Sequence, residues 1–144
     1  MATFEKAQPG TCLIGRAKHG ADLLEELTAV CAENNITLGS VTAIGALQKA
    51  RVGYYNQDTR SYEYLDLDRH LEITALVGNV SLKDDKPIIH AHVSLSDNEG
   101  RGFGGHLAPG TIVFACEFVI QSLEGAELCR GLDDETGLPL WKMD

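Results

Sequence analysis

The sequence has no cluster of basic residues. Its 12 lysines and arginines are scattered among 21 acidic residues, which gives a formal net charge of −9. Binding to DNA or RNA draws much of its affinity from Lys and Arg side chains that neutralise phosphates. The charge therefore argues against direct DNA contact by this chain, and DNA remains a candidate partner only if an oligomer gathers a local positive patch.

The sequence also lacks a long apolar run. No segment approaches the roughly 18 consecutive apolar residues of a membrane-spanning helix. Residues 1–6 lack the basic and then apolar pattern of a secretory signal peptide. From these two features we expect a cytoplasmic location and no membrane partner.

The four cysteines show no metal-binding or disulfide spacing; they are Cys12, Cys31, Cys116 and Cys129. Cys31 belongs to a helical apolar stripe, and Cys116 lies in the apolar run 112–116. We expect both to be reduced thiols in the core. Because no base accompanies them in the sequence, a catalytic cysteine is disfavoured.

The 144 residues are enough for one domain with a substantial core. Leu23, Leu27 and Val30 recur at the spacing of one buried helix face, and Asp22 can cap a helix over residues 22–35. The rest of the chain has strand patterns separated by short turns. The expected strands are 11–16, 37–46, 48–55, 61–68, 71–80, 88–95, 111–121 and 126–131, with a turn-rich tail at 136–141. This pattern predicts an α+β domain on a mostly antiparallel sheet, a single compact unit over 1–144 with its core at about 11–141.

Histidines provide the clearest chemical signal. His90 and His92 are two residues apart in an apolar strand, so both imidazoles should project from one face. His106 follows Gly104 and Gly105, where the chain can turn back beside them. Three converging imidazoles form a metal site with one coordination position left open. The alternative is that these histidines make only ordinary hydrogen bonds, as most histidines do.

The remaining two histidines have a different sequence context. His19 lies in the loop Lys18–Gly20, and His70 stands at the expected start of a strand. We expect both to be solvated and outside the metal site. The metal itself is expected to be zinc or another divalent transition metal, since imidazole also suits nickel and cobalt.

Taken in order, several short motifs resemble the PPC family (plants and prokaryotes conserved), which is often described as having a DNA-binding motif. They extend over nearly the whole chain and are Thr42–Leu47, Leu71–Ile73, Gly78–Asn79, His90–His92, Asp97–Gly100 and Gly104–Leu107. The resemblance implies a stand-alone prokaryotic type that forms a homotrimer, with a metal held by His90, His92 and His106. Plant members carry AT-hook segments, and this sequence has none. The candidates to line a pocket around the ion are Glu72, Asn79, Gly105, Glu117 and Arg130.

Three functions are consistent with these features. The first is a trimeric, DNA-associated or regulatory protein with a structural or ligand-sensing metal. The second is a small metal-dependent enzyme in which Glu72 or Glu117 acts as a general base beside the open zinc position. Both carboxylates could instead form salt bridges, for example to Arg130 or Lys49. The third is an assembly scaffold in which the trimer buries sheet edges.

Overall fold

The computed structural model describes residues 2–143, and nine strands and one helix are defined within that range. All ladders between these strands are antiparallel. The predicted α+β architecture, mostly antiparallel with one main helix, is confirmed. The elements are β1 (Ala7–Ala17), α1 (Leu23–Glu33), β2 (Gly39–Asn56), β3 (Ser61–Leu67), β4 (Leu71–Lys83), β5 (Lys86–Ser96), β6 (Gly102–Leu107), β7 (Ile112–Gly125), β8 (Arg130–Leu132) and β9 (Pro139–Trp141).

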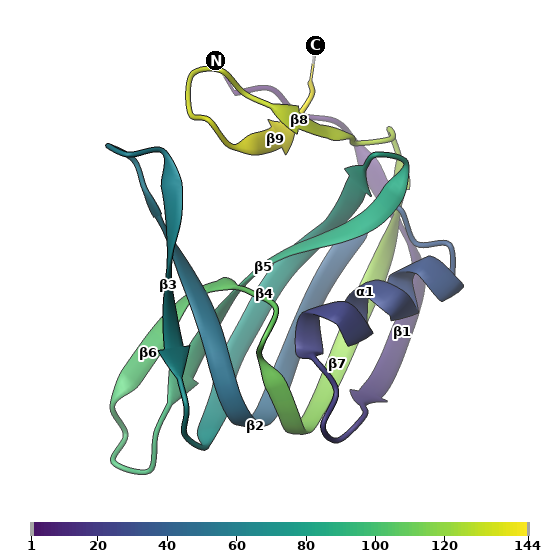
Figure 1. Ribbon diagram of the computed structural model, residues 1–144. Coiled ribbons are helices and arrows are strands. Elements are labelled where there is room, and N and C mark those ends of the chain that lie inside the picture. The colour runs from purple at the N-terminus through teal and green to yellow at the C-terminus, as the bar shows by residue number, and fades with distance from the viewer. Residues whose placement is uncertain (1, 144) are drawn as a thin grey trace.

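The long strand β2 organises the main sheet (Figure 1). Its first part pairs with β7 and β4, and its second part pairs with β3 and β6. Since β6 also pairs with β5, the order β2–β4–β5–β6 returns to β2 and closes part of the sheet on itself. The β5–β6 ladder places His106 opposite His92, and the closure places His106 opposite Gly53 of β2.

The two adjoining extended segments expected at 37–46 and 48–55 belong to one strand, β2, which begins at Gly39. Between them, the ladder with β7 shifts register on both sides of Leu47. Such a shift is a β-bulge, which bends a strand without ending it. Leu47 is buried, so the strand continues through the core at the residue between the two segments.

Helix α1 begins and ends close to the predicted boundaries. The Asp22 carboxylate accepts hydrogen bonds from the backbone N–H groups of Leu24 and Glu25, and the C-cap is Asn34. The predicted stripe packs on one face of the sheet, with Leu23 and Leu27 fully buried. Cys31 and Cys116 are buried as expected, and the thiols of residues 2–143 form no disulfide.

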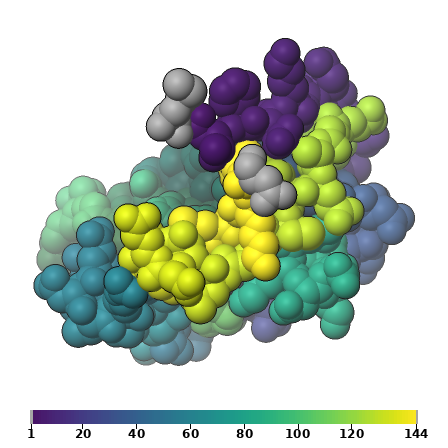
Figure 2. Space-filling view, turned by 90° about the horizontal axis from the view of Figure 1, so that it is seen from above, coloured from purple at the N-terminus to yellow at the C-terminus, as the bar shows by residue number. Residues whose placement is uncertain are grey.

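The C-terminal segment is more ordered than the expected tail. Its β8 and β9 strands pair with each other, and the loop between them lies against the β2–β3 hairpin. Tyr55 donates a hydrogen bond to the Thr136 carbonyl, and Arg60 donates to the carbonyls of Asp134 and Glu135. In the view from above, this segment covers one end of the molecule (Figure 2). No helix within residues 2–143 combines the length and the apolar character needed to cross a membrane.

Candidate metal centre

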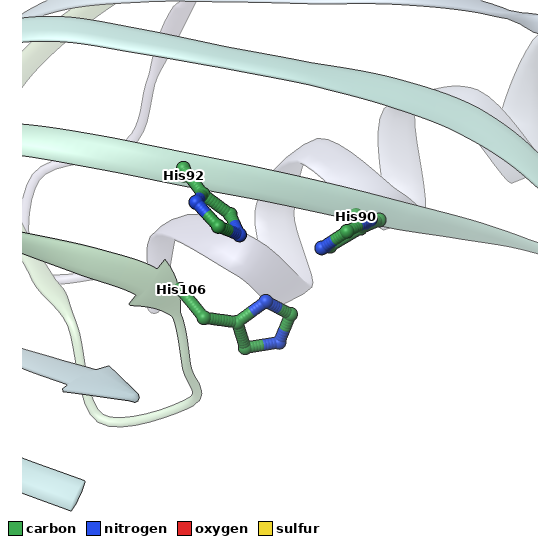
Figure 3. Close-up of side chains that lie close together, drawn as sticks. All are labelled: His90, His92 and His106. Atoms are coloured by element: carbon green, nitrogen blue, oxygen red, sulfur yellow. The ribbon is translucent and has the colours of Figure 1, made fainter. Parts of the chain in front are cut away.

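The three predicted histidines converge in the structure (Figure 3). His92 is directly opposite His106 in the β5–β6 ladder, and His90 is opposite Asn79 in the β4–β5 ladder. Directly opposite residues in an antiparallel pair share a face, so register alone places all three imidazoles on the same side of the sheet. His90 and His92 share that face because they are two apart on β5.

The distances between the rings are compatible with a shared ion. One ligand nitrogen from each histidine can be chosen so that all three lie within 4.8 Å of one another. The ring centroids are 5.3 Å apart for His90 and His92, 5.0 Å for His90 and His106, and 5.7 Å for His92 and His106. Nitrogens bound to a tetrahedral zinc at about 2.0–2.1 Å are separated by about 3.3 Å. Small side-chain rotations are enough to close this difference.

Two of the three histidines, His90 and His106, are held in the form that binds metals. Burial lowers the pKa of His106 to about 4, with further contributions from His90, His92 and Arg130. Burial also lowers the pKa of His90, assisted by Arg130 and His92. Both imidazoles are therefore neutral at pH 7, as a metal ligand must be. The Nδ1 atom of His106 is buried and has no hydrogen-bond partner within residues 2–143. A metal ion would accept the lone pair of this nitrogen, so the three histidines fit a metal ion.

Gly105 allows β6 to approach β2 closely. A Cβ atom on Gly105 would lie 2.7 Å from the Gly53 carbonyl oxygen. Any larger residue would push β6 away from β2 and would displace His106, which is opposite Gly53 in the ladder. The expected role of the glycines before His106 is thus a close backbone approach.

A hollow of about 690 Å³, which we call the histidine pocket, opens beside the three imidazoles. The Tyr62 ring lies 4.9 Å from the His106 ring, and Tyr55 and the β8–β9 segment form further parts of the wall. The lining side chains come from α1, β2, β3, β5, β6 and the C-terminal segment. They are Leu24, Thr28, Gly53, Tyr54, Tyr55, Tyr62, Ile88, Ile89, His90, His92, Gly105, His106, Arg130, Leu138, Pro139 and Leu140.

Two of the predicted pocket residues interact beside the histidines. Arg130 lines the histidine pocket and donates a hydrogen bond from Nη2 to Asn79 Oδ1 at 2.7 Å. Asn79 is in turn opposite His90 on the neighbouring strand. Sequence reasoning did not identify the tyrosines or Leu138–Leu140, because their contribution depends on how the β2–β3 hairpin and the C-terminal segment fold over the site.

Glu72 and Glu117 are not in the histidine pocket, which corrects the expectation that one of them stands beside the metal. Glu72 is opposite Ala46 and Ser96, and Glu117 is opposite Arg16 and Ile44. Each lines a different hollow of the molecule. Both are exposed, and neither forms an ion pair within residues 2–143, so the alternative salt bridges to Arg130 or Lys49 are also absent there.

His19 and His70 are exposed and away from the cluster, as predicted. The Nδ1 atom of His19 lies 2.8 Å from the Phe114 carbonyl oxygen, and the two rings meet edge to face. Both histidines line a separate hollow that includes Glu72 and Asp97.

Similar structures come from archaea and bacteria. A metal-containing protein of Archaeoglobus fulgidus is 38% identical with a TM-score of 0.93, covering 98% of this chain and 99% of that one. A plant- and prokaryote-conserved (PPC) protein of Pyrococcus horikoshii is 35% identical with a TM-score of 0.92, covering 99% and 97%. A Ralstonia eutropha protein, described as a proposed DNA-binding protein, is 26% identical with a TM-score of 0.81, covering 91% and 90%.

Among curated proteins, the bifunctional protein GlmU of Synechococcus sp. (strain JA-3-3Ab) is 34% identical over 120 residues. The match covers 82% of this chain and 18% of that protein, so the chain spans less than a fifth of its relative. Residues 4–124 match the family of the Plants and Prokaryotes Conserved (PCC) domain, written PPC above. The chain belongs to this family.

Proposed function

We propose that this protein is a regulatory metal-binding domain that holds one divalent transition metal, preferably zinc, through His90, His92 and His106. The observation that carries the proposal is the convergence of three ligand nitrogens within 4.8 Å, with the buried Nδ1 of His106 unpartnered. A metal-containing relative with 38% identity supports it. Three histidine ligands leave a fourth position open, so the ion would supply a Lewis-acidic site for water or for a ligand atom.

The residues around the site favour binding over hydrolysis. Within residues 2–143, no aspartate or glutamate lines the histidine pocket, so these residues supply no carboxylate base of the kind we expected in Glu72 or Glu117. Tyrosines, leucines and Arg130 form its walls instead. Such a pocket can shield a bound molecule from water and orient it, which suits a sensor of a small ligand.

Metal content tests the proposal. Protein purified without a histidine tag, reconstituted with zinc and dialysed, is expected to hold one zinc per chain by mass spectrometry of the metal. His92→Ala should lose most of this zinc, whereas the matched variant His70→Ala should retain it, because His70 lies outside the cluster. Full zinc content in His92→Ala would remove the proposed site.

We also propose that the chain assembles as a homotrimer through what we call the outer apolar face, formed by Ile14, Ile44, Val77 and Val119. The ladders align Ile14, Val119, Thr42 and Val77 in one row across the sheet. Ile14 is 84% exposed and Val77 is 64% exposed in the single chain. A contiguous apolar patch of this kind is typical of an interaction surface.

Light scattering after size-exclusion chromatography tests the assembly. The protein is expected to elute with the mass of three chains, and Val77→Asp is expected to reduce this to the mass of one. Leu132→Asp is the matched control, since Leu132 is 72% exposed but lies on β8, outside the outer apolar face. A monomeric wild-type protein would contradict the proposal.

A DNA-associated role is the second candidate, supported by the description of the Ralstonia eutropha relative. The net charge of −9 opposes it, so we expect weak binding at most. An electrophoretic mobility shift at low salt decides this point, because phosphate contacts are strongest there. Absence of a shift under those conditions would leave only the metal-dependent regulatory role.

A further inference from the structure

Among the residues that the structure describes, Arg130 is a cation without an anionic partner. Its guanidinium donates to three neutral acceptors, Ser81 Oγ at 2.9 Å, the Pro139 carbonyl at 2.9 Å and Asn79 Oδ1 at 2.7 Å. Within residues 2–143, no carboxylate oxygen lies within 4.0 Å of it. A guanidinium has five N–H donors, so these three bonds fix its orientation and leave further donors for a ligand.

The position of Arg130 brings its charge to the metal centre. Arg130 is hydrogen-bonded to Asn79, which is opposite His90, and it lines the histidine pocket together with all three histidines. The charge of Arg130 is also among the causes of the lowered pKa values of His90 and His106. A divalent ion on three neutral imidazoles would add two positive charges to a pocket that no carboxylate of residues 2–143 lines. An anion bound between the ion and Arg130 would offset part of this charge.

The rest of the histidine pocket is suited to an apolar body. Leu24, Ile88, Leu138 and Leu140 line it, and Tyr55 and Tyr62 provide aromatic surface. A hollow of about 690 Å³ falls within the roughly 300–1,000 Å³ typical of sites for small organic molecules. Such a site combines apolar walls with a few polar groups that set orientation, and here the polar groups are the imidazoles and one arginine.

We propose that the ligand of this site is a small carboxylate with an apolar or aromatic body. Its carboxylate group faces Arg130 and the metal held by the three histidines, and its body lies among the leucines and tyrosines. This inference rests on the proposed function, since it needs the ion. A planar carboxylate matches the guanidinium fork. Phosphate fits less well, because within residues 2–143 Arg130 is the only arginine or lysine in the lining.

Titration calorimetry on zinc-loaded protein of measured metal content, with benzoate as the probe, tests the inference. Benzamide is the neutral control of the same shape, acetate lacks the apolar body, and inorganic phosphate is the competing anion. Benzoate is expected to bind about tenfold or more tightly than each of the three. Benzamide lacks the charge-assisted bond, acetate lacks the buried apolar surface, and phosphate lacks both the apolar surface and the planar carboxylate. Cobalt-loaded protein gives a second readout, since benzoate at the ion should change its visible absorption spectrum.

Arg130→Met removes the charge and keeps the length of the side chain. It is expected to retain zinc and to bind benzoate about tenfold more weakly. Arg130→Lys, which keeps a cation, should recover part of this affinity, and that recovery separates a ligand contact from a purely structural role of the three hydrogen bonds. Loss of benzoate affinity in Arg130→Met with no recovery in Arg130→Lys would count against the contact.

The outcomes separate the two claims. A zinc-loaded protein that binds benzamide or phosphate as tightly as benzoate overturns the carboxylate inference and leaves the metal site intact. Unchanged benzoate affinity in a folded Arg130→Met protein also overturns the carboxylate inference and leaves the metal site intact. A wild-type protein that binds no zinc overturns both the metal site and the inference that depends on it.

Discussion

Metal-free protein should lose stability as the pH falls from about 6.5 to about 4, in part because of His106. In the unfolded chain this histidine takes up a proton near its ordinary pKa of about 6.5. In the folded protein its pKa is lowered to about 4, mainly by burial and further by the charges of His90, His92 and Arg130. The unfolded state therefore binds more protons over this interval, so protonation favours unfolding as the pH falls.

The size of the effect follows from the shift. A difference of about 2.5 pKa units corresponds to about 3 kcal/mol, and partial exposure of the ring reduces this to about 2–3 kcal/mol. The loss is absent above about pH 6.5 and complete below about pH 4. Because His90 also has a lowered pKa, it contributes in the same direction.

Urea unfolding in the presence of a chelator measures this effect. Other groups titrate over the same range, so the comparison is between the wild type and His106→Gln at pH 7.5 and pH 4. The stability advantage of the wild type over His106→Gln is expected to decrease by about 2–3 kcal/mol between these two values. An NMR titration of the metal-free protein that placed the His106 pKa at or above 6.5 would refute the reasoning.

Two further substitutions test how the scaffold holds the site. Gly105→Ala should destabilise the protein by about 1–3 kcal/mol and weaken zinc binding, because a Cβ atom there would lie 2.7 Å from the Gly53 carbonyl oxygen. Urea unfolding measures the loss of stability, and a zinc competition titration measures the loss of affinity. Wild-type values in both assays would contradict the close approach of β6 to β2. Asp22→Ala should lower the free energy of unfolding by about 1–2 kcal/mol, since its carboxylate caps α1 and also accepts from the Gly110 N–H. Zinc content should stay at one per chain in Asp22→Ala, and loss of zinc there would show that the centre depends on the helix cap.

The convergence of the histidines could be predicted from the sequence because it follows from local rules. The spacing of His90 and His92 places them on one face of any strand. The two glycines before His106 indicated a close backbone approach, which the contact between Gly105 and Gly53 bears out. The helix could be predicted for the same reason, since its apolar stripe and its Asp22 cap are both local signals.

The surroundings of the site could not be predicted in this way. Glu72 and Glu117 were candidates because each interrupts an apolar strand, but both belong to residues that alternate toward solvent. Tyr55, Tyr62 and Leu138 reach the histidine pocket only because β2 bends into the β2–β3 hairpin and the C-terminal segment folds against it. The hydrogen bond from Tyr55 to Thr136 joins residues 81 positions apart, and no local pattern records such a contact.

Anomalous X-ray diffraction at the zinc edge, from crystals of zinc-loaded protein prepared without a tag, tests the central claim most directly. The expected result is one peak per chain, within about 2.0–2.1 Å of a nitrogen from each of His90, His92 and His106. A map with no peak among these three side chains, or with the zinc bound at other residues, would contradict the account.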